Sequence, residues 1–456
     1  MFSLITLKNF RAFNEIKFDL THGKNSAKSL AIVYGENGAG KSNLMSAFVL
    51  LKELFNTMNV RDRLEELINQ KDIFSDERLN QALKHQLMAG LRDMQAIIND
   101  YRMIGSNNHI TAEYEFFIAH NAGKYTVEFG ESEIVHERLE YTINTRRGVC
   151  FDCTDGNLFI NNSIVKNRDL LADIKADAKR FWGKHSIFAI ITHELQDKSS
   201  SFACDNIADN FFDVLGEFQT LSCFIGIGTR QWNKFSTPLS VLGNITDGQI
   251  STLEETQLDI IEDTLTRFFH AINSDIKRAY YKRNRNEKMI EYELFFEKLI
   301  SGEYRNIPFS KESTGNHQLI KTFCYLLTAC MGYTVVMDEA DSGIHDVLFQ
   351  KIIKEVAPKI KGQLIMTTHN TLLMEMDVAR DATYIVSEIE GGHKVIKCVS
   401  AYEKRTYINN NIRNKYLSND YKGLPTVNSI DIDYLISKIA SATNKYLERP
   451  SVDNED

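Results

Sequence analysis

One stretch constrains the fold of this 456-residue chain more than any other: Gly35-Glu36-Asn37-Gly38-Ala39-Gly40-Lys41-Ser42. It fits the phosphate-binding loop pattern, in which a glycine and four further residues precede Gly-Lys-Ser or Gly-Lys-Thr. The glycines let the backbone curl so that its N–H groups converge on a triphosphate. Lys41 is expected to reach the β- and γ-phosphates, and the Ser42 hydroxyl to hold Mg²⁺. The sequence therefore predicts that the chain binds ATP together with Mg²⁺.

The residues on either side of this loop agree with that prediction. Residues 30–33 read as a buried strand, and residues 43–54 carry apolar side chains at helical spacing. The loop then leads into the N-terminus of a helix, where the aligned peptide dipoles favour an anion. All eight loop residues and the next one, Asn43, are expected to contact the nucleotide.

Composition sets the broad class of the chain. Hydrophobic residues make up 43% and charged residues 25%, as in a soluble globular protein. No apolar run approaches the roughly 20 residues that cross a bilayer, and residues 1–8 alternate like a strand rather than like a signal peptide. We therefore expect a cytoplasmic protein that does not bind membranes. The net charge of −8 argues against a chain covered by nucleic-acid-binding surface, although a local basic patch is compatible with it.

The order of the predicted elements is that of an α/β protein with a parallel sheet, interrupted by long insertions. Strands are expected at 334–337 and 363–367, with helices at 314–331 and 347–356, after the strand and helix of the phosphate-binding loop. Residues with period two between 109 and 160 predict an antiparallel β subdomain. Ser251 and Glu254 form a capping box that is expected to open a helix through Phe269. The expected parts are an N-terminal ATPase part at 1–58, a helical insertion at 59–108, the β subdomain at 109–165, a mainly helical insertion at 166–299, and a C-terminal ATPase part and tail at 300–456.

Three segments leave alternatives open. The apolar stripe from Leu79 to Ile98 is compatible either with helices packed on the core or with a protruding partner surface. The basic cluster at 277–288 is interleaved with tyrosines and could contact nucleic acid, although a solvated strand or helix end is favoured. Cys150 and Cys153 form a lone CxxC pair without a second pair or a histidine at zinc spacing, so reduced thiols are expected.

Two later strands supply the second half of the nucleotide site. Residues 335–337 are an apolar strand followed by Asp338 and Glu339, and residues 364–368 lead to His369. Asp338 is expected to hold Mg²⁺, usually through water, and Glu339 to accept a proton from the water that attacks the γ-phosphate. Because these strands are expected to end at the edge of the sheet that carries the loop, His369 could hydrogen-bond the γ-phosphate. Glu339, Lys41 and His369 are the predicted catalytic residues.

The tetrapeptide Asp338-Glu339-Ala340-Asp341 also occurs in a helicase family, but the spacing argues against that class. In those helicases the phosphate-binding loop and the acidic motif share one compact domain, whereas 296 residues separate Lys41 from Asp338 here. Such a gap suits ATPases whose fold is split by a long insertion.

Taken in order, these motifs resemble those of the ABC/SMC/RecF superclass. The resemblance is carried by the phosphate-binding loop, Lys311-Glu312-Ser313-Thr314-Gly315, Asp338-Glu339-Ala340-Asp341-Ser342-Gly343-Ile344-His345 and Thr367-Thr368-His369-Asn370. More narrowly, the chain is similar to AAA15-type ATPases of abortive-infection systems, the AbiLi and overcoming-lysogenisation-defect relatives. Residues 409–425 also resemble the C-terminal segment of that family. The resemblance implies an ABC-type ATPase head, with a mixed sheet, an antiparallel β arm and an inserted helical domain.

The resemblance also implies roles for residues outside the two halves of the site. Ser313, Thr314 and Gly315 would form the signature loop that acts on the ATP of a second subunit, and a serine hydroxyl with a glycine amide at a helix N-terminus allows that chemistry. Asn9 and Arg11 would lie near the nucleotide. His345 departs from the pattern, because many relatives carry an aspartate there, and no glutamine of a Q-loop is placed.

The expected function is ATP hydrolysis by a head-to-tail dimer or higher homo-oligomer that senses infection or regulates a bacterial anti-phage system. Its effector, such as a nuclease, is expected to be encoded separately, because the 87 residues after His369 contain no convincing acidic cluster for a Toprim nuclease. One alternative is a RecF-like or SMC-like repair or maintenance ATPase that clamps DNA. Another is an ATP-binding scaffold with negligible turnover.

Overall fold

The computed structural model of this chain describes residues 1–69, 92–143, 145–155, 157–227, 230–236, 239–402, 411–425 and 429–447. The chain divides into two compact units, Met1–Gly423 and Leu424–Asp456. The described residues of the second unit include the helix α15 (Ile432–Leu447), and everything described below belongs to the first unit. Within the described ranges no helix is long and apolar enough to cross a membrane.

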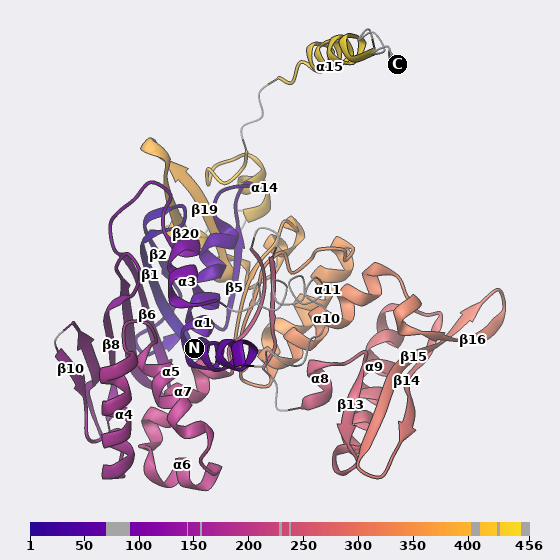
Figure 1. The fold of residues 1–456 in the computed structure, drawn as a ribbon. Coiled ribbons are helices and arrows are strands. Elements are labelled where there is room, and N and C mark those ends of the chain that lie inside the picture. Colours follow the sequence, from indigo (N-terminus) through magenta and orange to yellow (C-terminus); the bar gives the residue numbers. More distant parts are fainter. Residues whose placement is uncertain are drawn as a thin grey trace, which may run out of the picture. The chain divides into compact units, whose positions relative to one another are not determined.

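A seven-stranded mixed sheet carries the phosphate-binding loop (Figure 1). Its five inner strands are parallel, and an antiparallel strand closes each edge. The inner strands are apolar and buried, as expected for strands covered on both faces. In spatial order the strands are β12 (Arg230–Lys234), β11 (Ser222–Ile227), β17 (Thr334–Met337), β18 (Gln363–Thr367), β5 (Leu30–Tyr34), β19 (Thr383–Ile389) and β20 (His393–Cys398).

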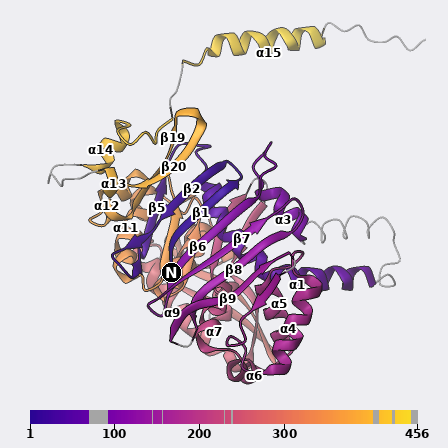
Figure 2. The same ribbon diagram turned by 90° about the vertical axis from the view of Figure 1, so that its left-hand side faces the viewer.

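A second seven-stranded sheet is antiparallel throughout (Figure 2). The strands Ile110–Ile118 and Asn121–Phe129 bury every second side chain over most of their length. The first strand of the chain pairs with a strand more than 100 residues later, so that Ile5 lies opposite Tyr114. In spatial order they are β10 (Asn157–Ile160), β9 (Arg146–Thr154), β8 (Ile134–Ile143), β7 (Asn121–Phe129), β6 (Ile110–Ile118), β1 (Phe2–Phe10) and β2 (Phe13–Asp19). A short hairpin, β3 (Thr21–His22) and β4 (Ser26–Ala27), follows β2.

Helices join the two large sheets into one hydrophobic core. The helix that follows the phosphate-binding loop has its apolar stripe, which includes Phe48, fully buried in this core. The helices that contribute apolar side chains here are α1 (Lys41–Asn69), α3 (Met94–Tyr101), α4 (Arg168–Phe181), α5 (Ile187–Gln196) and α7 (Asp209–Gln219). Short helices α6 (Ser200–Asn206), α12 (Ala379–Ala382), α13 (Val399–Tyr402) and α14 (Ile412–Leu417) complete this part of the fold.

A smaller sheet packs on its own core beside the helix that carries the expected signature loop. One face of this sheet covers α9, and Ile320 and Cys324 of α10 belong to the same cluster. The elements are α8 (Ser240–Gly243), β13 (Asp247–Ser251), α9 (Thr256–Ile272), β14 (Ile276–Arg285), β15 (Met289–Ile300), β16 (Glu303–Pro308), α10 (Thr314–Cys330) and, after β17, α11 (Asp346–Val356).

The expected α/β class is confirmed, and so are the strands at 334–337 and 363–367 and the antiparallel strands between 109 and 160. The expectation of mainly helical structure at 166–299 is met only in part. Helices fill this segment up to Gln219, but β11 and β12 then extend the parallel sheet and β13 to β15 form the smaller sheet. The proposed capping box is wrong, because Ser251 caps a 3₁₀ turn at Thr252–Glu254 and α9 begins at Thr256. Most of the apolar stripe from Leu79 to Ile98 lies outside the described residues.

The two cysteines of the CxxC pair lie in β9 as free, buried thiols. Burial raises the pKa of Cys150 to about 12 and holds that of Cys153 well above its ordinary value. A thiol of this kind is the inert, structural type.

A fully buried glutamate in the antiparallel sheet gives the unfolding free energy a predictable pH dependence. Glu137 accepts hydrogen bonds from the backbone N–H of Ile187 (2.8 Å) and from the Tyr125 hydroxyl (3.0 Å). Burial raises its pKa from 4.5 to about 7 despite these bonds. Between those two pH values the folded chain keeps a proton that the unfolded chain has lost, so the unfolding free energy falls as pH rises.

Glu137→Gln is expected to remove this contribution, because the neutral amide has nothing to titrate. The free energy of unfolding of the variant, minus that of the wild type, should rise by on the order of 3 kcal/mol between pH 4.5 and 8. Denaturant titrations at several pH values measure it. Glu131→Gln, at an exposed position shortly before the same strand, is the control, and equal slopes for wild type and Glu137→Gln would contradict the prediction.

Candidate functional site

The predicted nucleotide-binding residues lie at one edge of the mixed sheet. Strand β18 lies between β5 and β17, and the three strands are parallel, with Met366 opposite both Ile32 and Met337. Their carboxyl ends therefore face the same way. The phosphate-binding loop follows β5, Asp338 and Glu339 follow β17, and His369 follows β18 by one residue.

The phosphate-binding loop is tightly held against the first β-hairpin. Gly40 has φ +102°, and a Cβ at this position would lie 2.9 Å from the Phe13 ring, so only glycine fits. Lys41 is buried, and its Nζ donates to the carbonyl oxygens of Gly35 (2.8 Å) and Glu36 (3.1 Å). Burial lowers the pKa of Lys41, whereas the nearby carboxylates of Asp338, Glu339 and Glu36 act to raise it. The positive charge of Lys41 is therefore attracted by the carboxylates of Asp338 and Glu339, which follow β17.

A threonine that sequence reasoning did not single out fixes both acidic residues. The Thr367 hydroxyl donates to Asp338 Oδ1 (2.5 Å) and accepts from the backbone N–H of Glu339 (2.8 Å). Thr367 and Asp338 are buried, whereas Glu339 is exposed and has φ +49°, an unfavourable conformation for a glutamate. The N–H of Ala340 also donates to the Thr367 carbonyl (3.0 Å). Thr367 thus aims the Asp338 carboxylate and holds the strained backbone of Glu339.

Hydrogen bonds of Asn370 hold the segment that follows β18, whereas the His369 side chain in this segment is exposed. Asn370 donates through Nδ2 to the Asp346 carbonyl (2.8 Å), and its own carbonyl accepts from the buried Tyr34 hydroxyl (2.9 Å). The Asn370 N–H donates to Thr368 Oγ1 (2.9 Å). In the described part of the chain the His369 ring makes no hydrogen bond, so it is available to a ligand at this edge.

Arg11 lies in the turn between β1 and β2, and its side chain is directed at an aromatic ring. Its guanidinium carbon is 4.9 Å from the centroid of the Tyr101 ring, and Tyr101 donates to Glu53 Oε2 (2.8 Å) of α1. Arg92 forms an ion pair with the other oxygen of the same carboxylate, Glu53 Oε1 (2.6 Å). Burial raises the pKa of Glu53 to about 7, while Arg92 and Tyr101 act to lower it. Asn9, the other residue implied near the nucleotide, donates to the His109 carbonyl (2.9 Å).

The expected signature loop caps a helix at the surface. Ser313 is exposed and is the N-cap of α10, and its hydroxyl accepts from the Asn316 N–H (3.2 Å). The position of a Cβ on Gly315 would lie 3.3 Å from the Gly343 carbonyl, so the loop abuts the segment after Asp338-Glu339. No hydrogen bond joins Ser313 or Gly315 to residues 35–42 within the described ranges. His345 caps α11, where its Nδ1 accepts from the Val347 N–H (3.3 Å).

The basic cluster lies on β14, and most of its charge is compensated. Arg283 pairs with three carboxylates of the α9 region at 2.6 to 3.4 Å, and Arg285 pairs with one of them at 3.1 Å. Glu297 pairs with Lys277 (2.7 Å) and Arg278 (3.2 Å). These contacts favour the solvated strand over a nucleic-acid surface.

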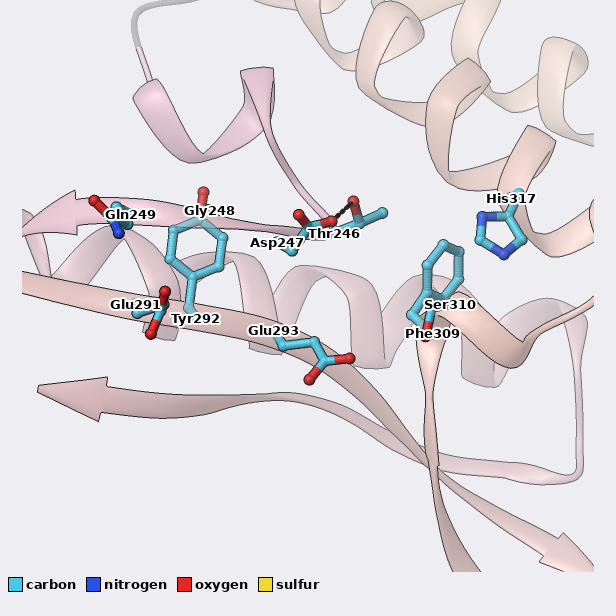
Figure 3. A pocket seen from close by; sticks show the side chains of 10 residues that line it. All are labelled: Thr246, Asp247, Gly248, Gln249, Glu291, Tyr292, Glu293, Phe309, Ser310 and His317. Carbon is cyan, nitrogen blue, oxygen red and sulfur yellow. Dashed lines mark hydrogen bonds between the residues drawn. The ribbon is translucent and has the colours of Figure 1, made fainter.

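A cavity of about 670 Å³ is lined by residues on both sides of Ser313 in the sequence, and no residue of the phosphate-binding loop lines it (Figure 3). The Phe309 and His317 rings, 4.4 Å apart, flank the expected signature loop in sequence. The cavity is lined by Thr246, Asp247, Gly248, Gln249, Glu291, Tyr292, Glu293, Phe309, Ser310 and His317. Asp247, Glu291 and Glu293 line this cavity, and their negative charge would repel a phosphate group.

The fold and the sheet edge define the class of the protein: an α/β protein with a phosphate-binding loop, whose acidic strand is separated from the loop strand by one further strand. Residues 229–375 match the family model described as "AAA domain, putative AbiEii toxin, Type IV TA system". The matched third of the chain contains the expected signature loop, Asp338, Glu339 and His369, and not the phosphate-binding loop. No curated protein matches the chain.

Solved structures that match over most of the chain include SMC head domains. The SMC head domain from Thermotoga maritima has a TM-score of 0.37 and 14% identity, and the match covers 87% of this chain and 98% of that one. An Smc head bound to the C-winged helix domain of ScpA has a TM-score of 0.42 and 12% identity, and the match covers 88% of this chain and 99% of that one. A third structure is an Smc head with an extended coiled coil, bound to the C-terminal domain of ScpA derived from Pyrococcus furiosus. Its TM-score is 0.39 and its identity 13%, and the match covers 88% of this chain and 97% of that one.

Proposed function

We propose that this protein is an ATPase of the ABC/SMC/RecF type that binds ATP with Mg²⁺ and hydrolyses it. The observation that carries the proposal is the sheet edge, where three neighbouring parallel strands end in the phosphate-binding loop, in Asp338-Glu339 and in Thr367 to His369. The carboxyl edge of a parallel sheet is where α/β proteins bind ligands.

The side chains at this edge fit a magnesium nucleotide. Thr367 bonds one Asp338 oxygen, Oδ1, and the Ser42 hydroxyl has no hydrogen-bond partner within the described ranges. Hydroxyl and carboxylate oxygens are the ligands that Mg²⁺ takes in proteins. Ser42 and Asp338 would hold Mg²⁺, which neutralises phosphate charge when bound. Among the described residues, the hydrogen-bond partners of Lys41 are two loop carbonyls, so its ammonium group can turn to the phosphates.

Catalysis by these residues would rest on position and charge. Glu339 is exposed at the strand end, beside the buried Asp338, so its carboxylate can accept a proton from a water molecule. His369, on the neighbouring strand end, can donate to the γ-phosphate. Both residues extend from a backbone held by Thr367, Thr368 and Asn370.

We also propose that two copies assemble head to tail, so that the Ser313 loop of each completes the nucleotide site of the other. Ser313 is exposed and lies at a helix N-terminus, and within the described ranges it makes no hydrogen bond to residues 35–42 of the same chain. These observations support the arrangement. Such an assembly would contain two equivalent sites, each drawn from both chains.

A mixing experiment tests the shared site. Lys41→Ala should disable a chain's own phosphate-binding loop, and Ser313→Arg should disable the loop that it offers to its partner, so each variant alone is expected to be inactive. In a mixed dimer, the intact phosphate-binding loop of the Ser313→Arg chain meets the intact Ser313 of the Lys41→Ala chain, which gives one complete site. An equal mixture should therefore regain about a quarter of wild-type ATP turnover per chain if sites act independently.

The control for this experiment mixes Lys41→Ala with a chain that carries both substitutions, which cannot form an intact site. A mixture of the two single variants that is no more active than this control contradicts the shared site, whereas activity of Ser313→Arg alone contradicts the role of the loop.

We further propose that the ATPase is the sensor or regulator of a bacterial anti-phage system and controls a separate effector. The family description of residues 229–375, which names an abortive-infection toxin and a toxin–antitoxin system, supports this role. Phage plating on cells that carry the native locus, with wild type or Lys41→Ala, tests it. Equal plating in both strains, or cleavage of DNA or RNA by the purified chain alone, would oppose it.

Measuring DNA affinity at several salt concentrations in the presence of ATP distinguishes this role from that of a DNA clamp. A clamp predicts tight binding that weakens steeply as salt rises. The ion pairs of β14 argue against it. An ATP-binding scaffold predicts no difference in turnover between wild type and Glu339→Gln.

A further inference from the structure

Three potential metal ligands lie close together on two helices that pack in the same core as the antiparallel sheet. None of the three belongs to the proposed nucleotide site. Asp177 lies on α4, and His193 and Glu194 lie on α5; one ligand atom of each residue is within 4.8 Å of the other two. All three side chains are half-buried. Helix α5 also packs against α1, so three helices meet here (Figures 1 and 2).

The two nitrogens of His193 have different environments. Nε2 is 2.9 Å from Asp62 Oδ2 of α1, and the other oxygen of that carboxylate accepts from Arg61 (2.6 Å). Nδ1 is shielded from solvent and has no hydrogen-bond partner in the described part of the chain. With a proton on Nε2 shared with Asp62, Nδ1 keeps its lone pair. A carboxylate on the outer nitrogen is the arrangement that orients metal-binding histidines.

The two carboxyl groups lie together without a cationic partner. One carboxylate oxygen of Glu194 lies within 4.8 Å of one of Asp177, and Asp173, one turn earlier on α4, adds a further negative charge. Among the described residues no lysine or arginine pairs with Asp177 or Glu194. Two adjacent carboxylates repel each other unless a proton or a cation lies between them.

We propose that Asp177, His193 and Glu194 bind a divalent transition-metal ion, and that this ion is Zn²⁺. One imidazole nitrogen with carboxylate oxygens is a donor set that Zn²⁺ accepts, whereas Mg²⁺ takes oxygen ligands. The ion would tie α4 to α5 and, through His193 and Asp62, to the helix that begins at Lys41. This site is separate from the proposed Mg²⁺ site, so the two proposals fail independently.

The test uses full-length protein stripped with a chelator and kept free of nucleotide, titrated with Zn²⁺ against a competing chromophoric chelator. We expect one Zn²⁺ per chain in wild type and in Asp338→Asn, which removes the proposed Mg²⁺ ligand. His193→Ala and Glu194→Gln should each weaken Zn²⁺ binding at least tenfold. Zn²⁺ should also raise the midpoint of thermal unfolding of wild type and not that of His193→Ala.

His136→Ala is the matched control, because His136 also places Nε2 2.9 Å from an aspartate oxygen and is 28% exposed, against 26% for His193. It should bind Zn²⁺ like wild type. If His193→Ala does not fold, Glu194→Gln carries the test. Wild type that binds no Zn²⁺, or His193→Ala and Glu194→Gln proteins that bind it as tightly as wild type, would overturn the proposal.

Discussion

Glu339→Gln is expected to lower ATP turnover about 100-fold or more while ATP still binds, because the amide cannot accept a proton from water. The substitution keeps the size of the side chain and the backbone contact of Glu339 to Thr367, so the fold should persist. ATP should then accumulate between two chains, and light scattering with ATP should report a dimer.

Glu355→Gln is the matched control for this prediction, since it makes the same change on the exposed face of α11 and should leave turnover unchanged. A Glu339→Gln protein that hydrolyses ATP like wild type would exclude this residue as the base. One that stays monomeric with ATP would contradict the proposed dimer.

Thr367→Val is expected to lower turnover roughly 10- to 100-fold, because it leaves a buried aspartate oxygen and the Glu339 N–H without partners, at about 1–3 kcal/mol each. Valine matches the shape of threonine, so the change tests the hydroxyl alone. Since the hydroxyl aims Asp338, the Mg²⁺ concentration for half-maximal turnover should rise as well.

Thr367→Ser keeps the hydroxyl and should restore both turnover and Mg²⁺ dependence toward wild type. A purely structural role would instead lower the unfolding midpoint without moving the Mg²⁺ dependence. If Thr367→Val retained wild-type turnover, the positioning role of this threonine would be wrong.

The sequence was sufficient to predict the strands and residues nearest the phosphate-binding loop. Residues 334–337 and 363–367 are short apolar runs followed by polar residues, a pattern that indicates buried parallel strands ending at a sheet edge. The parallel register then brings Asp338, Glu339 and His369 to the same edge as Lys41. Their roles in ATP binding and hydrolysis stay predictions.

The contacts that fix these residues could not be predicted, because they join distant positions. Thr367 reads as the last residue of a buried strand, and nothing local indicates that its hydroxyl bonds two residues of another strand. Likewise, β11 joins the parallel sheet by pairing Phe224 with Met337, so its neighbours are set by long-range packing. A polar side chain at the end of an otherwise apolar strand was the one available signal.

The side chain of Gln363 links the first strand of the chain to the strand that leads to His369. Its amide bonds both the N–H and the carbonyl of Phe2 (2.8 Å each), 361 positions earlier, and also the Lys28 carbonyl (2.9 Å). During synthesis these groups must wait until Gln363, which lies within the last third of the sequence, has left the ribosome. The phosphate-binding loop is thus translated early and acquires its neighbouring strand late, which leaves apolar strand β5 without β18 throughout the interval.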